Sequence, residues 1–310
     1  MRSLPMSKEP PKKMVRVSLL SLLCVAAFAQ QNTAPKSQAP DLSHSATLSQ
    51  EQIRELIRRA AERDIENDKQ QRNYTYIERD EEHRLSGDGK VKSRESRTVE
   101  IMDLYGHRVR RAIAKDDKPL SDKDAAREEE KIQKVIDKGK NESDEDRRKR
   151  LEKEDKQTEE DREFVKEVAD AYDFRLAGTE VLEGRSAYVI DADPRPGFEP
   201  HQKNAKFLPK FRFRVWIDEK DEEWIKLDIQ CIDTVSVGLF LASIHKGSNI
   251  QIEQTEVNNE VWLPKHVSLR LDARVLFSGE HVESDVTYRD YKKFRTDTRI
   301  VPVGEAQPSH

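Results

Sequence analysis

Histidines are the side chains of this sequence best suited to acid–base or metal chemistry, and their spacing forms no recognisable motif. No two stand four residues apart, which is how a zinc protease holds its metal on a helix, and no cysteine pair could complete a zinc site. His245, His266 and His281 could meet across strands, which the sequence alone does not decide. The eight histidines are His44, His83, His107, His201, His245, His266, His281 and His310.

Other catalytic patterns are also missing from the sequence. It contains no Gly-x-Ser-x-Gly elbow, no phosphate loop and no dinucleotide-binding fingerprint. With 60 Asp and Glu residues, a carboxylate dyad can be neither located nor excluded. Trp216, Trp224 and Trp262 could stack on sugars, but packing in a sheet or at its rim is the favoured interpretation. We therefore predict that the protein is not an enzyme and uses no metal and no cofactor.

The composition of the chain argues against a nucleic-acid partner. The 310 residues include 56 Lys and Arg against 60 Asp and Glu, so the net charge is −4. Charged residues make up 37% of the chain, well above the roughly 25% of an average globular domain. The charge is concentrated in segment 115–163, whereas apolar residues are frequent from 171 to 301. The core is therefore expected mostly in the C-terminal half.

The N-terminus has the features of a cleavable signal peptide. Basic residues precede an apolar run over 17–28, which is too short to span a membrane, and Ala-Phe-Ala follows at 27–29. We predict a signal peptide at 1–29 and a periplasmic mature chain. An uncleaved anchor is a less favoured alternative. Acylation of Cys24 is another alternative, because acylated cysteines stand at the end of such an apolar run. It is not favoured, since Leu23 stands where a small residue is expected.

After cleavage only one cysteine, Cys231, is left, so the exported domain has no intramolecular disulfide and depends on packing. Cys231 lies in a predicted strand, and we interpret it as a buried core thiol. We expect a flexible lead-in at 30–47, a single domain at 48–301 that contains the charged insertion 115–163, and a tail at 302–310.

One amphipathic helix is predicted at about 49–69. Ser49 and Gln52 form a capping box, which is typical of a helix N-terminus. Apolar residues then recur at helical spacing, so one face of this helix must lie against an apolar surface. These residues are Ile53, Leu56, Ile57, Ala60, Ala61 and Ile65.

Period-two alternation predicts strands on both sides of the charged insertion. Short turn signals such as Ser86–Gly89 and Glu183–Arg185 separate them, and hairpin-length links indicate an antiparallel meander. The longest predicted strand covers 261–277. Segment 235–244 is the most apolar stretch of the mature chain and breaks the alternation, so we expect a loop or short helix there. It could pack in the core, line a pocket or act as a gate.

The charged insertion 115–163 mixes acidic and basic residues at separations of three and four, which supports a solvent-exposed helix. The basic run at 147–150 is flanked by acidic residues, so its field largely cancels. The favoured interpretation is a solvated helical arm, and contact with a partner or a phosphate is the alternative. Apolar residues from Phe164 onward return the helix to the core.

Several short motifs resemble the LolA-like family of periplasmic lipoprotein carriers, which includes the outer-membrane lipoprotein-sorting proteins. The resemblance covers about 48–114 and 164–295, and none of its motifs is catalytic. It is carried by the signal peptide, the first helix, the strand meander and the motifs Phe213–Asp218, Lys246–Ser248, Glu253–Gln254, Val261–Pro264 and Tyr288–Phe294.

The resemblance implies an α+β fold: a strongly curved antiparallel β-sheet, or half-barrel, covered by helices, here with a long charged helical insertion. It also implies an apolar cavity that holds lipid acyl chains under a lid, for which helix 49–69 and segment 235–244 are candidates. The predicted cavity and lid residues are Ile53, Leu56, Ile57, Val215, Val237, Leu239, Phe240, Leu241, Ile244, Leu269, Leu271 and Val275.

The expected partner is a lipid or a lipidated protein, with transient membrane contact. A second hypothesis is an envelope sensor or adaptor that binds a partner protein through 115–163. A third is a structural role in the envelope without a small ligand.

Overall fold

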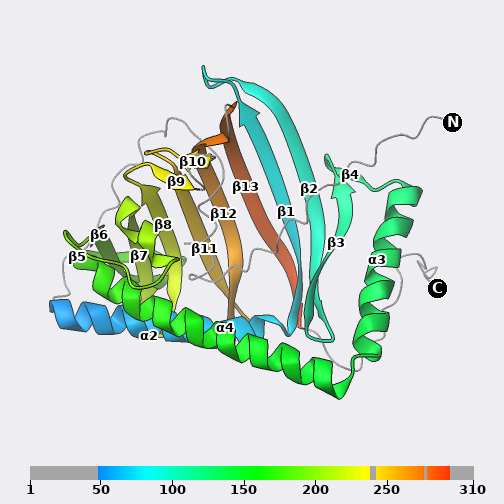
Figure 1. The fold of residues 1–310 in the computed structure, drawn as a ribbon, viewed down its shortest axis with the longest axis horizontal. Helices are drawn as coiled ribbons and strands as arrows, with labels where there is room; N and C mark the ends of the chain where they lie inside the picture. The colour runs from blue at the N-terminus through cyan, green and yellow to red at the C-terminus, as the bar shows by residue number, and fades with distance from the viewer. Residues whose placement is uncertain (1–47, 238–241, 276–277, 294–310) are drawn as a thin grey trace.

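The computed structural model describes residues 48–237, 242–275 and 278–293, which form one large antiparallel sheet with helices packed against it (Figure 1). The predicted signal peptide, the lead-in 30–47 and the tail 302–310 lie outside the described residues. So do Leu239, Phe240 and Leu241.

The helices agree with the capping and periodicity of the sequence. Ser49 caps the first described helix with the reciprocal bonds to Gln52 that the capping box predicts, and Ser121 and Ser143 cap the next two through their side chains. The described helices are α2 (Gln50–Gln71), α3 (Asp122–Lys140), α4 (Asp144–Ala171) and the 3-10 helix η1 (Ala205–Lys210).

The strands alternate between a buried and a more polar face, as the period-two pattern predicts. They are β1 (Tyr74–Leu85), β2 (Val91–Leu104), β3 (His107–Lys115), β4 (Lys118–Pro119), β5 (Tyr172–Leu182), β6 (Arg185–Pro194), β7 (Phe211–Asp218), β8 (Trp224–Cys231), β9 (Val235–Val237), β10 (Ala242–Ile244), β11 (Asn249–Val257), β12 (Val261–Val275) and β13 (Ser278–Lys293).

The sheet is a meander, so most strands pair with their neighbours in sequence. The order is β4-β3-β2-β1-β13-β12-β11-β8-β7-β6-β5, with β9 and β10 off this path and β10 paired to β12. The β5–β6 hairpin turns at Glu183 and Gly184, whose φ values of 51° and 83° suit a two-residue turn. The long-range pairing of β1 with β13 joins the two ends of the described chain.

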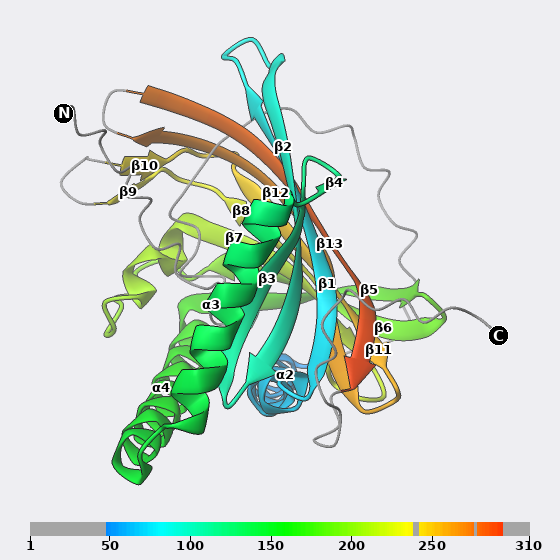
Figure 2. The ribbon, with the colours of Figure 1, turned by 90° about the vertical axis from the view of Figure 1, so that its right-hand side faces the viewer.

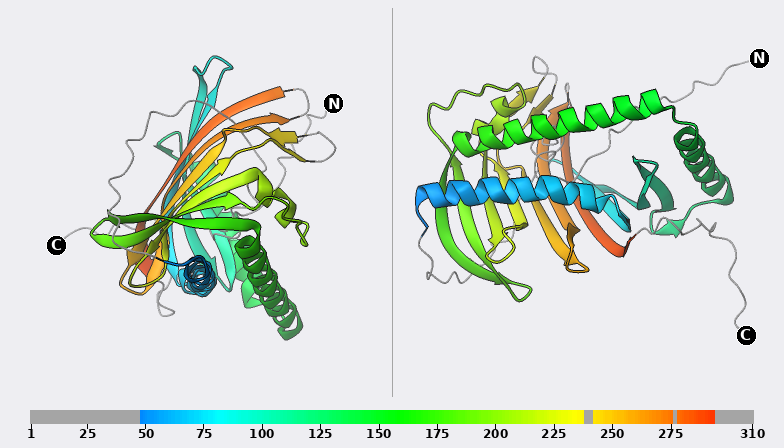
Figure 3. Two further views of the ribbon diagram at one scale, coloured as in Figure 1. Left: turned by 90° about the vertical axis from the view of Figure 1, so that its left-hand side faces the viewer. Right: turned by 90° about the horizontal axis from the view of Figure 1, so that it is seen from below.

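The charged insertion connects the two edges of this sheet. It leaves edge strand β4, forms α3 and α4, and returns at the opposite edge strand β5. Figure 1 shows α4 crossing along one end of the strands, and Figure 3 shows α2 running beside it. Figure 2 shows α3 standing against β3.

The sheet is covered by helices on different faces in its two halves. The largest buried cluster joins the apolar face of α2 and the last turns of α4 to β5–β8, β11 and β12. A smaller cluster on the other face joins Ile132 of α3 to Met102 and Leu104 of β2. Ile101, the neighbour of Met102 in β2, points to the opposite face of the sheet and packs with Tyr76 and Tyr288. The two faces of β2 therefore belong to different clusters.

The expected α+β fold with an antiparallel sheet and covering helices is confirmed, but the sheet is open and is not strongly curled into a half-barrel. Its edges are joined by a helical crossover of about fifty residues rather than by strand pairing, so nothing closes it. The expectation of a loop or short helix over 235–244 is wrong at both ends of the segment, because Val235–Val237 and Ala242–Ile244 pair as a short hairpin.

Candidate functional site

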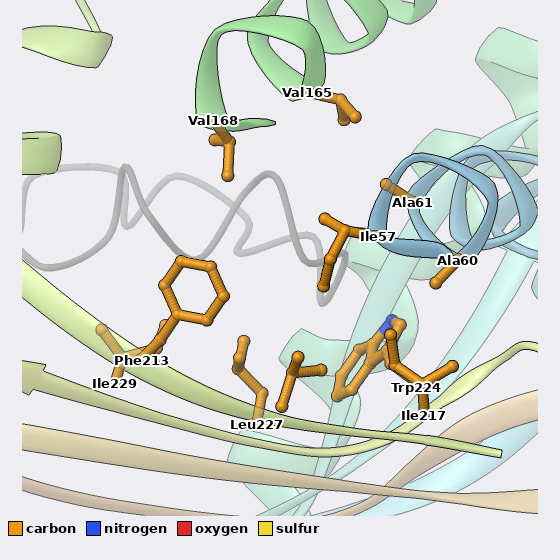
Figure 4. A pocket seen from close by; sticks show the side chains of 11 residues that line it. Ile57, Ala60, Ala61, Val165, Val168, Phe213, Ile217, Trp224, Leu227 and Ile229 are labelled. Atoms are coloured by element: carbon orange, nitrogen blue, oxygen red, sulfur yellow. The ribbon is translucent and has the colours of Figure 1, made fainter. Parts of the chain in front are cut away.

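An apolar cavity lies where α2 and α4 meet the sheet, and we call it the helix–sheet seam (Figure 4). Figure 4 shows the side chains of both helices facing those of β7 and β8 across it. Its lining is entirely hydrophobic, so the seam can hold a hydrocarbon but offers no acid, base or metal ligand. The lining residues are Ile57, Ala60, Ala61, Val165, Val168, Phe213, Val215, Ile217, Trp224, Leu227 and Ile229.

A β-bulge creates the sheet wall of the seam. Val215 of β7 pairs with Leu227 of β8, but Ile217 pairs with Trp224 because the register shifts between them. The shift puts Trp224 on the helix-facing side together with Leu227, although the two positions are three apart in the sequence and strict alternation would place them on opposite faces.

The seam is small in this conformation. Its volume is about 40 Å³, which is room for a few water-sized groups and far too little for a long acyl chain. The unfilled space leaves atoms of the apolar walls without partners on one side, so the walls lose dispersion contacts. A long acyl chain does not fit the seam in this conformation.

Helix α2 is fixed to the sheet by buried polar contacts. The indole N–H of Trp224 donates to the buried carboxylate of Asp64 at 2.8 Å. Asn67 accepts from the backbone N–H of Trp262 at 2.8 Å and donates to its carbonyl at 2.7 Å, and Gln71 donates to the same carbonyl at 3.2 Å. These bonds hold the C-terminal half of α2 in one register on β8 and β12.

Helix α4 is attached to α2 more weakly at the seam. Arg162 forms ion pairs with Glu62 at 2.8 Å and Glu66 at 3.6 Å, and these side chains are 35–52% exposed. Such exposed pairs are each worth roughly 0–1 kcal/mol. Within the buried cluster the contacts of α4 are apolar, through Phe164 and Val165. Away from the seam, Glu154 of α4 pairs with Arg72 at 2.9 Å, and the buried Glu167 accepts from the backbone N–H of Gln202 at 3.1 Å. Across the seam itself, the polar contacts between α4 and α2 are therefore weaker than those between α2 and the sheet.

One carboxyl group near α2 has a strongly shifted pKa. Burial raises the pKa of Glu223 to about 7, and the neighbouring carboxylate of Asp64 adds to the effect while Arg63 opposes it. Glu222, one residue earlier, forms a bidentate pair with Arg59, which lowers its pKa. The turn before β8 therefore contains one paired carboxylate and one carboxyl group that titrates near neutral pH.

The charged insertion is docked on the sheet rather than projecting from it. A Cβ at Gly139 of α3 would overlap the Tyr105 side chain in the β2–β3 turn. Arg150 of α4 lies against Gly106 in the same turn and forms a bidentate pair with Glu142 at 2.8–2.9 Å. The corner between α3 and α4 is therefore held by close packing and charge pairing.

The structure places the predicted cavity residues in three groups. Ile57 and Val215 line the seam. Ile53, Leu56, Ile244 and Leu271 belong to the same buried cluster, and Leu269 packs against it. Val275 is half-buried opposite Ala242, and Val237 lies on β9. Leu239, Phe240 and Leu241 lie outside the described residues.

Most of the seam lining was absent from the predicted set. The alternation of Phe211, Phe213 and Val215 indicates that Phe213 shares a face with Val215, and the apolar residues from Phe164 onward include Val165 and Val168. No sequence signal placed α4 beside α2, because that neighbourhood depends on a crossover between the sheet edges. Strict alternation along β8 assigns Trp224 to the other face, so its place in the seam depends on the β-bulge.

The described residues contain neither a metal-binding cluster nor a membrane-spanning helix. Across residues 48–237, 242–275 and 278–293, no cluster of three or more His, Cys, Asp or Glu side chains is suited to holding a metal ion. Over the same ranges, no helix has both the length and the apolar character needed to cross a membrane. Cys231 is buried, and burial raises the pKa of its thiol to about 11.

Comparison with solved structures finds several matches at low sequence identity. The chain is similar to a DUF1329 family protein from Desulfovibrio piger (11% identity, 79% of this chain and 93% of that chain, TM-score 0.29). It is also similar to a putative outer membrane lipoprotein-sorting protein domain from Vibrio parahaemolyticus (9% identity, 73% and 87%, TM-score 0.29). A third match is a LolA superfamily protein from Nitrosomonas europaea (10% identity, 80% and 94%, TM-score 0.26).

No family model and no curated protein sequence matches the chain. The likeness to these structures concerns the fold alone.

Proposed function

We propose that this protein binds the acyl chain of a lipid or a lipidated protein in the helix–sheet seam. The observation that carries the proposal is the wholly apolar, incompletely filled lining between α2, α4, β7 and β8. Hydrophobic transfer supplies about 0.8 kcal/mol for each buried methylene, so such a seam can retain an acyl chain without any polar contact.

Opening of the seam is part of the proposal. Since 40 Å³ cannot hold an acyl chain, we assign the lid role to the C-terminal half of α4. Its exposed ion pairs to Glu62 and Glu66 are weak, whereas α2 stays attached through Asn67 and Asp64. This differs from the two lids expected from the sequence, helix 49–69 and segment 235–244.

The cellular context belongs to the same proposal. Residues 1–29 would export the chain to the periplasm, where 48–301 would act as one domain that includes the insertion. The lipid or lipoprotein could then be shielded from water between two membranes, with transient membrane contact at loading or release.

The proposal is tested by photo-crosslinking in the mature chain, residues 30–310. A fatty acid that carries a diazirine near its methyl end is bound, irradiated and mapped by peptide mass spectrometry. Adducts on the peptides that contain Val165, Phe213 or Leu227 are expected. Absence of binding, or adducts confined to other parts of the chain, would refute the proposal.

A second candidate function is partner binding through the charged insertion. The observation that favours it is the run of exposed charged side chains along the N-terminal half of α4, together with Leu151, which is 46% exposed there. A Leu151→Glu variant would weaken capture of an envelope partner in a pull-down, and acyl-chain binding in the seam would be unchanged.

A further inference from the structure

A group of side chains that could do acid–base chemistry lies on the sheet face opposite to the seam. Ile244 of β10 and Leu271 of β12 belong to the buried cluster under α2. Neighbouring residues in a strand point to opposite faces, so Ser243 and Asp272 point away from that cluster. His245, the residue that follows β10, contacts both of them. This places them outside the seam and its proposed ligand.

These three side chains form a continuous hydrogen-bonded chain. The Nδ1 atom of His245 lies 2.5 Å from Oδ1 of Asp272, and its Nε2 atom lies 3.2 Å from Oγ of Ser243. The side chain of Asp272 is only 10% exposed, whereas that of His245 is 37% exposed. The hydroxyl and the carboxylate are thus shielded, and solvent reaches the group at the imidazole.

A change of strand partner brings the three residues together. β12 pairs with β11 as far as Arg270 and with β10 from Ala273 onward, so Asp272 lies at the change. The backbone N–H of His245 donates to the carbonyl of Asp272 at 2.6 Å. The N–H of Asp272 donates to Oγ of Ser248 at 2.9 Å, so both backbone groups of Asp272 are held.

We propose that Ser243, His245 and Asp272 form a nucleophile–base–carboxylate triad that hydrolyses carboxylic esters. Asp272 accepts the Nδ1–H of His245, which fixes the tautomer whose Nε2 can accept the hydroxyl proton of Ser243. The two residues of a Ser–His pair usually come from distant parts of a chain. Here Ser243 lies on β10 and His245 is the first residue after this strand, only two positions away.

The proposed reaction is an acyl transfer to Ser243 followed by hydrolysis. Oγ attacks the ester carbonyl carbon while its proton passes to Nε2 of His245, and the C=O electron pair moves to the oxygen. When the tetrahedral species collapses, the ester C–O bond breaks and the alcohol leaves with the proton from Nε2. Water then attacks the acyl-Ser243 ester by the same proton route, which releases the carboxylic acid and restores the serine.

Arg274 is placed to stabilise the oxyanion. It pairs directly with Ser243 in the β10–β12 ladder, so both side chains stand on one face. Arg274 is exposed, and within the part of the chain that the structure describes no carboxylate forms an ion pair with it. A guanidinium beside the attacked carbonyl would stabilise the developing negative charge.

The test is covalent labelling of the full mature chain with a biotinylated fluorophosphonate, combined with hydrolysis of p-nitrophenyl butyrate. The adduct should map by peptide mass spectrometry to Ser243 in the wild-type chain. Ser243→Ala and His245→Ala should each lower labelling and hydrolysis at least about 100-fold. Ser236→Ala is the matched control, because this exposed serine lies opposite Ser243 on β9 and is not part of the proposed triad, so its activity should stay at the wild-type level.

Circular dichroism shows whether each variant is folded. The adduct site on the wild-type chain tests the proposal even if a variant is not. No labelling of the folded wild-type chain, at a probe concentration that labels a known serine esterase, would overturn the proposal. An adduct on a serine other than Ser243, or hydrolysis that persists in Ser243→Ala, would overturn it as well.

Discussion

Adding one methylene to the wall of the seam should have two linked effects. Val165 of α4 lines the seam, and Val165→Ile extends its side chain into the 40 Å³ void. A void of this size costs about 1 kcal/mol at roughly 24 cal/mol per Å³, and one buried methylene contributes about 0.8 kcal/mol. We therefore expect the variant to be about 0.8 kcal/mol more stable than the wild type.

The same methylene should weaken acyl-chain binding, because it occupies space that the ligand must enter. A stabilisation of about 0.8 kcal/mol for the closed seam corresponds to about a fourfold loss of affinity. The stability is measured by urea unfolding and the affinity by titration with a fluorescent fatty acid. Both measurements use the mature chain at the same pH and salt.

Val181→Ile is the matched control, because it adds the same methylene to a strand residue that is 71% exposed. It should change neither the unfolding free energy nor the affinity by a measurable amount. A lower unfolding free energy for Val165→Ile than for the wild type would contradict the prediction. So would a higher unfolding free energy combined with wild-type affinity for the fatty acid. The second result would mean that the seam is a packing defect and not a binding site.

Three further predictions follow from contacts around the seam and the charged insertion. Burial raises the folded pKa of Glu223 to about 7 from an ordinary 4.5, so the wild-type protein loses stability as the pH rises through this range. At about 1.4 kcal/mol per pKa unit, Glu223→Gln should gain about 3 kcal/mol on the wild type above pH 7 and nothing below pH 4.5 in unfolding titrations. Asn67→Ala should cost about 2–3 kcal/mol by urea unfolding, because both backbone groups of Trp262 lose a buried partner. Gly139→Ala should destabilise by about 1–3 kcal/mol through overlap with Tyr105, although the same change in an open helix would stabilise.

A specific result would contradict each of these predictions. A constant difference between Glu223→Gln and the wild type across pH would exclude the proposed titration. An Asn67→Ala loss no larger than that of Gln70→Ala, at an exposed position on the same helix, would mean that the buried bonds contribute nothing. Gly139→Ala should recover when Tyr105, which has φ +55°, is also changed to Gly, and failure to recover would place the strain elsewhere.

The elements determined by neighbouring residues could be predicted from the sequence. The capping box at Ser49 and the helical spacing after it locate α2, and the turn at Glu183 and Gly184 locates the β5–β6 hairpin. The alternation of Phe211, Phe213 and Val215 identifies the helix-facing side of β7. Each of these signals involves residues only a few positions apart, so it can be recognised from the sequence alone.

The seam and the triad could not be found in this way, because they depend on long-range placement. The pairing of α4 with α2 follows from a crossover between sheet edges, and one register shift turns Trp224 toward the helices. The contact of His245 with Asp272 depends on where β12 changes partner. The sequence showed only that His245 could meet residues of other strands.

The central claim, that the seam opens to bury an acyl chain, is tested most directly by varying chain length. The dissociation constants of saturated fatty acids with 8, 10, 12 and 14 carbons are measured by isothermal titration calorimetry on the mature chain. If the chain enters the seam, each methylene adds about 0.8 kcal/mol, which is about a fourfold gain in affinity. An affinity that does not change with chain length would contradict the claim, because the hydrocarbon would then remain in water.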